Sequence, residues 1–208
     1  DNTAPSIGSL SLSSQPDTTP DLTFTAEASS SVVITSSGTS GTVGSTGSAT
    51  GSAQAITLST LDAGTQTLTA TATDAAGNTA ADTISVTIDG TAPTAAITYS
   101  EAGPYKSGDS ITITATFNEA VQDSPVPQIA ITGANTVSAT NMAKTSTTVY
   151  TYSHTVGSGD GNAAVVMSAA LDTAGNAVTA TPTSGSPFVV DNTAPSIGSL
   201  SLSSQPDT

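Results

Sequence analysis

The sequence of 208 residues lacks cysteine, tryptophan and arginine, and it carries little charge. Without cysteine there are no disulfides, thiolate metal ligands or cysteine nucleophiles. Charged residues make up 9% of the chain, against about a quarter in a usual soluble protein, and two lysines stand against 16 acids. Because nucleic acids and anionic membranes need basic residues as counter-charges, the net charge of −14 argues against both as partners.

The sequence also has no long apolar run and few residues suited to catalysis, which disfavours membrane proteins and most enzymes. No apolar run approaches the length of a transmembrane helix, so we expect no membrane insertion. A single histidine and no arginine leave few groups for acid–base or phosphoryl-transfer chemistry. We therefore expect neither an enzyme nor a small-molecule substrate, and we expect His154 to be an exposed residue of a strand or turn.

The residues that are abundant are small and polar, with 40 threonines and 32 serines. Aromatic residues are 3% of the chain, which together with the net charge resembles a disordered composition. However, apolar residues alternate with Thr or Ser through 65–73 and 82–88, as in half-buried strands. No segment keeps a helical period, so the sequence predicts a folded all-β protein with a thin core.

A long internal repetition predicts that the chain is a fragment of a tandem array. Residues 1–18 and 191–208 are identical, which gives a period of 190 residues. Within the period, the motif Asp-x-Thr-Ala-Pro occurs at 1–5, 89–93 and 191–195, and Asp-x-Ala-Gly-Asn occurs at 74–78 and 172–176. This order predicts two related domains, 6–89 and 94–191. Linker residues 1–5 precede them, a cation-binding linker 90–93 joins them, and 192–208 form the next linker and the first strand of the next copy.

Short strands fill both predicted domains. Those of the first domain are expected at 6–12, 21–27, 32–35, 54–59, 65–73 and 82–88, and the Ser/Gly-rich stretch 36–53 is a loop or a pair of weak edge strands. Those of the second domain are expected at 95–99, 110–117, 127–131, 136–140, 147–154, 163–169 and 186–190. This number of strands in about 100 residues is typical of an immunoglobulin-like β-sandwich, so we predict two such domains in tandem.

Most acidic residues fall at predicted strand ends, and the sandwich topology brings several of them together. In an immunoglobulin-like domain, the entering chain and two of the loops share one end. The acids expected at the 89–93 linker are Asp62, Asp89, Glu119 and Asp172, with Asp17 as a further candidate. Those expected at the 191–195 linker are Asp109, Asp160 and Asp191, together with Asn192. Asp1, Glu27 and Asp74 would form a half-site at the start of the chain.

Such groups of carboxylates call for a cation. Two carboxylates about 4 Å apart repel by about 1–4 kcal/mol, depending on the effective dielectric. Two lysines cannot pair with all of these acids, and Ca²⁺ takes six to eight oxygen ligands. Asn78, Asn176 and nearby backbone carbonyls would complete the shell. The sequence therefore predicts Ca²⁺ as the cofactor, while the alternative is that Asp, Asn and Gly only form turns here.

The stretch TATATDAAGNTAADTISVTIDGTAP, residues 69–93, resembles the closing strands and linker of bacterial Ig-like domains. GDSITITATFNEAV, SAALDTAGN and FVVDNTAP are similar to a second subclass of these repeats. The whole chain resembles the extender region of giant RTX adhesins, which leave Gram-negative cells by type I secretion and remain on the cell surface. The resemblance implies Ca²⁺ at the linkers, on Asp89, Asp191, Asp74, Asp172 and Glu119.

The predicted function is mechanical. Ca²⁺ at the linkers would turn a monomeric string of domains into a stiff rod whose partners are the neighbouring repeats of the same chain. One alternative is a carbohydrate- or cell-surface-binding module that uses Tyr99, Tyr105, Tyr150 or Tyr152, although packing in the core or at an edge is favoured for these residues. Another is an ice-binding surface on the threonine ladder of 65–73, which the twist of a sheet disfavours.

Overall fold

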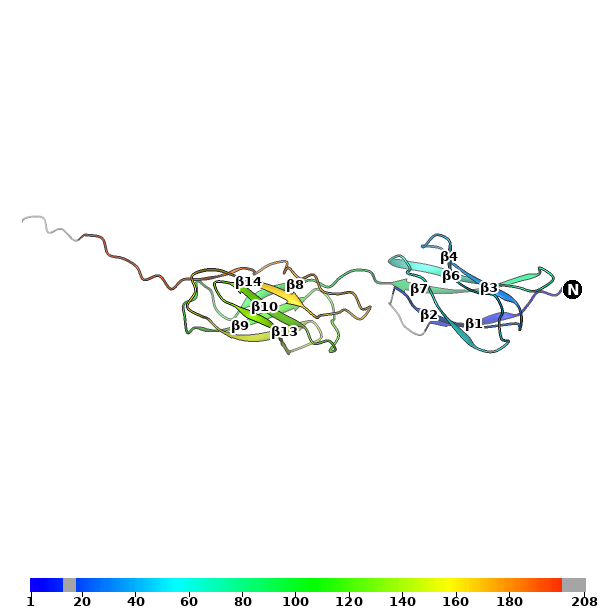
Figure 1. Cartoon of the computed structure of the whole chain (residues 1–208), viewed down its shortest axis with the longest axis horizontal. Coiled ribbons are helices and arrows are strands. Elements are labelled where there is room, and N and C mark those ends of the chain that lie inside the picture. Colours follow the sequence, from blue (N-terminus) through cyan, green and yellow to red (C-terminus); the bar gives the residue numbers. More distant parts are fainter. Residues whose placement is uncertain (13–17, 200–208) are drawn as a thin grey trace, which may run out of the picture. The chain divides into compact units, whose positions relative to one another are not determined.

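The computed structural model describes residues 1–12 and 18–199. These residues form 15 strands and no helix, which confirms the predicted all-β class (Figure 1). Within the described part of the chain, no helix is long and apolar enough to span a membrane. The chain divides into two compact units, which comprise Asp1–Pro93, Glu119–Pro125 and Ala170–Val178 in unit 1, and Thr94–Asn118, Val126–Ala169 and Thr179–Thr208 in unit 2.

Two antiparallel sheets build unit 1. The three-stranded sheet has the order β1-β2-β5, and the four-stranded sheet has the order β4-β3-β6-β7. In Figure 1, β1 and β2 lie on the opposite side of the unit from β3, β4, β6 and β7. The strands are β1 Ile7–Leu12, β2 Asp21–Ala26, β3 Ser31–Ser36, β4 Thr42–Thr46, β5 Gln54–Thr57, β6 Gly64–Thr73 and β7 Thr79–Ile88.

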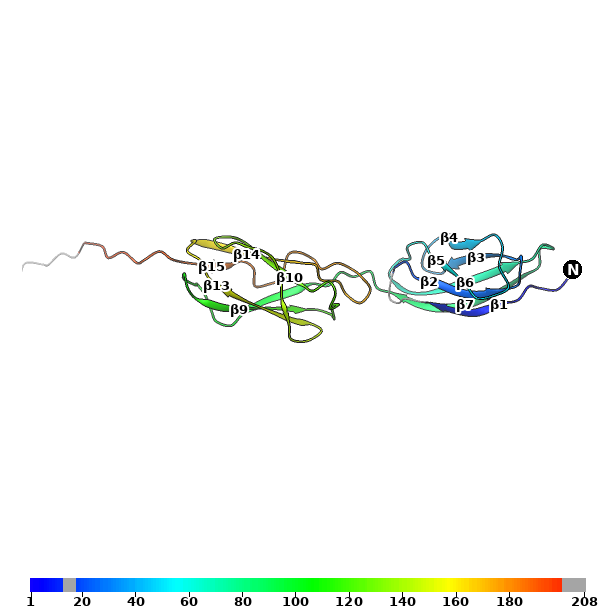
Figure 2. The same cartoon turned by 60° about the horizontal axis from the view of Figure 1, so that its bottom comes forward.

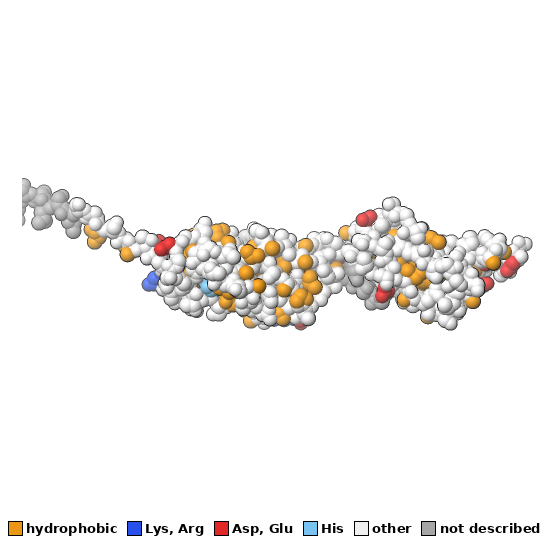
Figure 3. Space-filling view, viewed as in Figure 1, with side chains coloured by type: hydrophobic (Ala, Val, Ile, Leu, Met, Phe, Trp, Pro, Cys, Tyr) orange, Lys and Arg blue, Asp and Glu red, His pale blue; other side chains and the backbone are white. Residues whose placement is uncertain are grey.

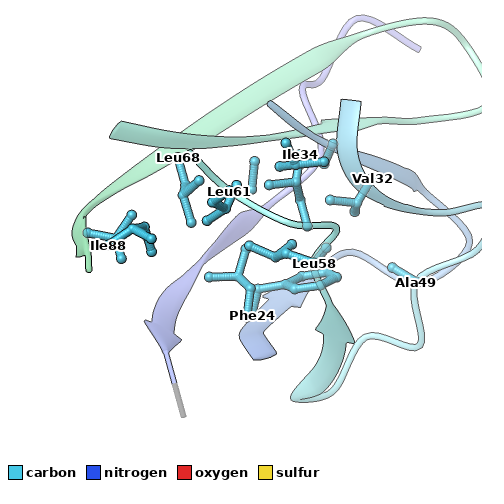
Figure 4. Packing of buried hydrophobic residues seen from close by; sticks show 14 residues of the cluster. Phe24, Val32, Ile34, Ala49, Leu58, Leu61, Leu68 and Ile88 are labelled. Carbon is cyan, nitrogen blue, oxygen red and sulfur yellow. The ribbon is translucent and has the colours of Figure 1, made fainter. Parts of the chain in front are cut away.

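The core of unit 1 lies between these two sheets. Along β6, Leu68, Ala70 and Ala72 are buried, while the threonines between them face outward. Figure 4 shows Ile34 and Leu68 directed toward Phe24 of the opposite sheet and toward Leu58, which follows β5. The alternation seen in the sequence therefore places one face of each sheet in a shared apolar core, whose burial drives folding.

Two irregular features of unit 1 have local causes. Ile7 and Leu10 are three residues apart, which would put them on opposite faces of a regular strand. A register shift between Gly8 and Ser11, with φ of 57° at Ser9, allows both to pack against the core. In the Ser/Gly-rich stretch 36–53, residues Thr42–Thr46 form the edge strand β4.

Unit 2 contains two antiparallel four-stranded sheets. Their orders are β11-β10-β14-β15 and β12-β13-β9-β8. In Figure 2, β10, β14 and β15 lie on one side of the unit and β9 and β13 lie on the other. The strands are β8 Ala95–Tyr99, β9 Ser110–Phe117, β10 Gln128–Gly133, β11 Val137–Asn141, β12 Ala143–Lys144, β13 Val149–Thr155, β14 Gly161–Ser168 and β15 Phe188–Val190. The sequence did not predict β12.

The core of unit 2 contains several aromatic rings in contact, whereas Phe24 is the single aromatic residue among the described core residues of unit 1. Phe117 packs edge-to-face on Tyr150 with ring centroids 5.8 Å apart, and Phe188 packs on Tyr99 and Tyr105 at 5.5 and 5.9 Å. Edge-to-face pairs of this kind add to the stabilisation that comes from buried area alone.

The expectation that His154 is exposed is wrong. The alternation of β13 that buries Tyr150 continues to His154, which is also buried. The Oδ1 atom of Asn135 accepts hydrogen bonds from Gly157 N–H at 2.7 Å and from His154 Nε2 at 2.9 Å. The imidazole is therefore satisfied as a core residue, and burial lowers its pKa.

Candidate metal centre

Three acidic residues of unit 1 come together where three segments meet. Asp89 follows β7, Glu119 lies two residues beyond β9, and Asp172 begins the loop 172–176. One carboxylate oxygen from each lies within 4.8 Å of the others. Among residues 1–12 and 18–199, this is the one group of three or more acidic, histidine or cysteine side chains so arranged. The structure thus brings together three of the acids expected at this linker.

Asp172 is fully buried, and its own loop holds it. Its Oδ1 accepts the N–H groups of Ala174 and Asn176, both at 2.8 Å, and its Oδ2 accepts Asn176 Nδ2 at 2.8 Å. Gly175 has φ of 92°, a left-handed conformation that allows the loop to turn back to Asp172. These bonds fix the orientation of the carboxylate, and all of them come from uncharged donors.

Two contacts hold the other segments against this loop. Asn176 Nδ2 also donates to the carbonyl oxygen of Asp89 at 3.0 Å, which fastens the linker. Val121 forms a bridge with Asp172, and Gln122 Nε2 donates to the Asp172 carbonyl at 2.6 Å, which fastens the segment that carries Glu119. Gln122 was not among the predicted site residues, because it lies outside the repeated motifs.

The arrangement has no cationic side chain in its own unit. Both lysines of the chain, Lys106 and Lys144, belong to unit 2. At an effective dielectric between that of water and that of a protein surface, each carboxylate pair at this spacing repels by about 1–4 kcal/mol. A cation bound by oxygen ligands would offset this repulsion, and the carboxylates with nearby carbonyl oxygens match the ligands that Ca²⁺ prefers.

The acids Asp1, Glu27 and Asp74 form a more open version of the same arrangement. Asn78 Nδ2 donates to Asp74 Oδ2 at 2.8 Å and to the Asp1 carbonyl at 3.2 Å, as Asn176 does in the other loop. The hydrogen bond from the Asn78 side chain lowers the pKa of Asp74, with burial opposing it. Asp1, Glu27 and Asp74 line a hollow of about 230 Å³. Asp1 and Glu27 are exposed, and the three carboxylates do not meet within 4.8 Å.

The acids expected at the 191–195 linker lie in unit 2 but do not form such a group. Asp109 Oδ2 accepts the N–H of Lys106, and Asp160 Oδ1 accepts the N–H of Asn192 at 2.6 Å. Asn192 Oδ1 accepts the Ser107 N–H at 2.6 Å, so this oxygen is engaged within the protein. Asp191 Oδ1 accepts the N–H of Thr193, as Asp1 and Asp89 do in their own copies of the motif.

Two remaining candidates lie away from the group. Asp62 is exposed, and its backbone N–H donates to Thr39 Oγ1. Its carboxylate is not among the oxygens that gather with Asp89, Glu119 and Asp172. Asp17 lies outside the described residues.

The tyrosines considered for sugar binding divide into two groups. Tyr150 is buried, and Tyr152 stacks on His154. Tyr99 and Tyr105 line a mainly apolar hollow of about 330 Å³ together with Pro104 and Phe188. The hydroxyl groups of Tyr99 and Tyr105 donate to the carbonyl oxygens of Gly185 and Glu101 at 2.5 Å. Both hydroxyl protons are therefore engaged inside the protein.

With the fold and the acidic sites described, the chain can be compared with known proteins. Residues 14–90 match the family profile of the bacterial Ig-like domain. This part of the chain is therefore similar to bacterial Ig-like domains. The matched residues include Glu27 and Asp74 of the half-site and the linker acid Asp89, but not Asp1.

Solved structures with this type of β fold are distant. A tetra-tandem repeat from the extending region of a large adhesion protein is 22% identical, with a TM-score of 0.36, and the similarity covers 92% of this chain and 50% of that one. The fibronectin(III)-like modules of Clostridium thermocellum CbhA are 16% identical over 87% of this chain and 91% of that one, with a TM-score of 0.31.

A third structure is SGBP-B from the Bacteroides ovatus mixed-linkage glucan utilization locus, in complex with a mixed-linkage heptasaccharide. It is 18% identical over 92% of this chain and 48% of that one, with a TM-score of 0.31. The chain thus spans about half of the adhesion-protein structure that it resembles. No curated protein sequence matches the chain.

Proposed function

We propose that this chain is part of the extender region of a bacterial surface adhesin, and that Ca²⁺ bound at its linkers stiffens the tandem array. Stiffening would hold ligand-binding domains, carried elsewhere in the full protein, away from the cell. The exact recurrence of residues 1–18 at 191–208 and the match of residues 14–90 to the bacterial Ig-like domain support the structural half of this proposal. Because the chain resembles giant RTX adhesins, we further propose that the full protein is exported by type I secretion, remains on the cell surface and acts in biofilms.

One observation carries the calcium half of the proposal. Asp89, Glu119 and Asp172 present carboxylate oxygens within 4.8 Å of one another, and Asp172 is fully buried. Burying a carboxylate beside two others is costly unless a positive charge compensates for it. A divalent ion at this position would be coordinated by the linker through Asp89 and by two loops through Glu119 and Asp172.

The surface composition fits an extracellular spacer. The face in Figure 3 shows mainly backbone and uncharged polar side chains, with scattered hydrophobic atoms and acidic groups at a few places. Extracellular calcium modules bind with dissociation constants of about 10⁻⁴–10⁻³ M. A site of that affinity would be empty in the cytosol and occupied outside the cell, so the array would stiffen only after secretion.

The test is the coupled tumbling of the two units, measured by ¹⁵N relaxation of the 208-residue chain in millimolar Ca²⁺ and in EDTA. We expect one rotational correlation time for both units in Ca²⁺ and separate, shorter times in EDTA. Glu119→Gln should keep the separate times in Ca²⁺. Glu101→Gln, which removes the same charge from an exposed position of unit 2, should behave as the unaltered chain. Tumbling that Ca²⁺ does not change would contradict the proposal.

A further inference from the structure

The two kinds of linker in the 190-residue period differ at one position. Asp191-Asn192-Thr193-Ala194-Pro195 repeats residues 1–5, whereas the linker at 89–93 has Gly90 in place of the asparagine. The side chain at this position determines how the linker is fastened to the residues that precede it.

Asn192 is fastened to unit 2 by its side chain and its backbone. Its Nδ2 donates to the carbonyl oxygens of Gly157 and Gly159 at 3.3 and 2.7 Å. Its Oδ1 accepts the Ser107 N–H at 2.6 Å, and its own N–H donates to Asp160 Oδ1 at 2.6 Å. The neighbouring Asp191 N–H donates to the Tyr105 carbonyl at 2.8 Å.

These bonds reach two separate segments of unit 2. Ser107 lies before β9, and 157–160 lie between β13 and β14. Both segments belong to the chain that precedes the linker. The side-chain bonds are made by neutral groups, without any cation.

Gly90 has no side chain that could do the same. Within the described part of the chain, the hydrogen bond seen for residues 90–93 joins Thr91 N–H to Asp89 Oδ1. It therefore stays inside the linker and does not reach the preceding domain. A Cβ atom at position 90 would lie 3.2 Å from the Ala63 Cβ, so this linker passes close to Ala63, which would have to shift slightly for any side chain at this position.

Both linkers are fastened to the residues that follow them in the same way. Asn176 Nδ2 donates to the Asp89 carbonyl, and Asn78 Nδ2 donates to the carbonyl of Asp1, which occupies the position of Asp191 in the repeat. The difference between the linkers is therefore confined to the preceding side.

We propose that the array has two kinds of joint: the 191–195 linker is held by Asn192 before any cation binds, and the 89–93 linker is a hinge. Without a cation, the array would then bend at every second linker, once per 190 residues, and move as rigid pairs of domains. This inference concerns the cation-free state, so it does not depend on the proposed calcium site.

The test compares two chains that contain the same domains in opposite order. In the chain described above, the Gly90 linker joins the domains. A chain of residues 94–208 followed by 19–93 reads through the natural repeat and joins the same domains through the Asn192 linker. In EDTA, ¹⁵N relaxation should give separate tumbling of the two domains in the first chain and one common, longer correlation time in the second.

The decisive variant is Asn192→Gly in the second chain, which converts that linker into the sequence Asp-Gly-Thr-Ala-Pro. This variant should restore separate tumbling in EDTA and should speed the amide hydrogen exchange of Ser107. The control variant Asn141→Gly, at a strand end of the same domain, should leave the common tumbling intact. Equal tumbling of the two chains in EDTA, or common tumbling that survives Asn192→Gly, would overturn the inference. A Ca²⁺ effect on the first chain tests the proposed function separately.

Discussion

The loops that begin with Asp172 and Asp74 share a motif but differ in how far they close. In each loop, the side chain of an asparagine donates a hydrogen bond to the carboxylate of the aspartate four residues before it. Each asparagine also donates to the backbone carbonyl of a linker aspartate. Yet Asp172 is fully buried beside two other acids, whereas Asp74 is partly exposed at the edge of a hollow. The repeated motif is therefore sufficient for the turn but not for the acidic cluster.

The difference arises in the segment that supplies the glutamate. After Glu119, Val121 and Gln122 are attached to Leu171 and Asp172, so the glutamate is drawn to the aspartate loop. After Glu27, Ser29 N–H donates to the Ala49 carbonyl, and Ala49 N–H donates to the carbonyl of Ser30. The second segment is thus attached elsewhere, and Glu27 remains exposed. Closure depends on side chains outside the motif.

The largest effect should follow from Asp172→Ala. In EDTA the substitution leaves two backbone N–H groups without their acceptor, which costs about 1–3 kcal/mol of unfolding free energy, and relief of repulsion offsets part of this. In Ca²⁺ the unaltered chain should gain about 2.7 kcal/mol at a hundredfold excess over the dissociation constant, and the variant should gain nothing.

Thermal unfolding in Ca²⁺ and in EDTA checks this prediction. Asp74→Ala is the matched control, because it removes the same group from the open loop and should cause the smaller loss in both solutions. A calcium-induced rise in Tm that persists in Asp172→Ala would place the bound ion elsewhere.

Gln122→Ala should have the next largest effect. It should loosen the attachment of the Glu119 segment to the loop 172–176 without any change of charge. The variant loses the hydrogen bond to the Asp172 carbonyl, which is worth about 1 kcal/mol, so Ca²⁺ affinity should fall about fivefold. Gln54→Ala removes a side-chain acceptor from the other side of unit 1 and should leave the affinity unchanged. If calcium titrations give the same affinity for both variants, Gln122 does not hold the cluster closed.

Acidification should lower the stability of unit 2 but not that of unit 1 through His154, because this histidine lies in unit 2 and burial lowers its pKa. In the unfolded chain the imidazole takes up a proton near pH 6.5, whereas in the folded chain it does so only at lower pH. The stability contributed by the neutral imidazole is therefore present above pH 6.5 and is lost as the pH falls below it. Calorimetry between pH 7 and 5 should show a falling transition for unit 2, and His154→Asn should flatten this dependence.

The smallest effect concerns the open loop. Hydrogen bonds from Asn78 lower the pKa of Asp74, so this carboxylate stabilises the folded state above its unfolded pKa of about 3.9. That contribution disappears as the pH falls through the lower folded value. Asp74→Asn should therefore be less stable than the unaltered chain at pH 6, and the two should converge in strong acid. A difference that stays constant with pH would mean that the charge of Asp74 does not contribute.

Much of this comparison was predictable from the sequence, because alternation and motif order are local signals. The strands at 95–99 and 110–117 have the predicted bounds, and the meeting of Asp89, Glu119 and Asp172 follows from sandwich topology. The role of Gln122 was not predictable, since it depends on a contact between residues 50 positions apart. His154 was misplaced because a polar residue in an alternating strand gives no sign of its partner, here Asn135.

The proposed stiffening depends on a calcium site formed by Asp89, Glu119 and Asp172. Isothermal titration of the 208-residue chain with Ca²⁺ tests it most directly, with Glu119→Gln and Glu101→Gln as the matched pair. We expect saturable binding in the unaltered chain and in Glu101→Gln, with a loss of at least one bound ion in Glu119→Gln. Binding that is absent from the unaltered chain, or unchanged in Glu119→Gln, would contradict it.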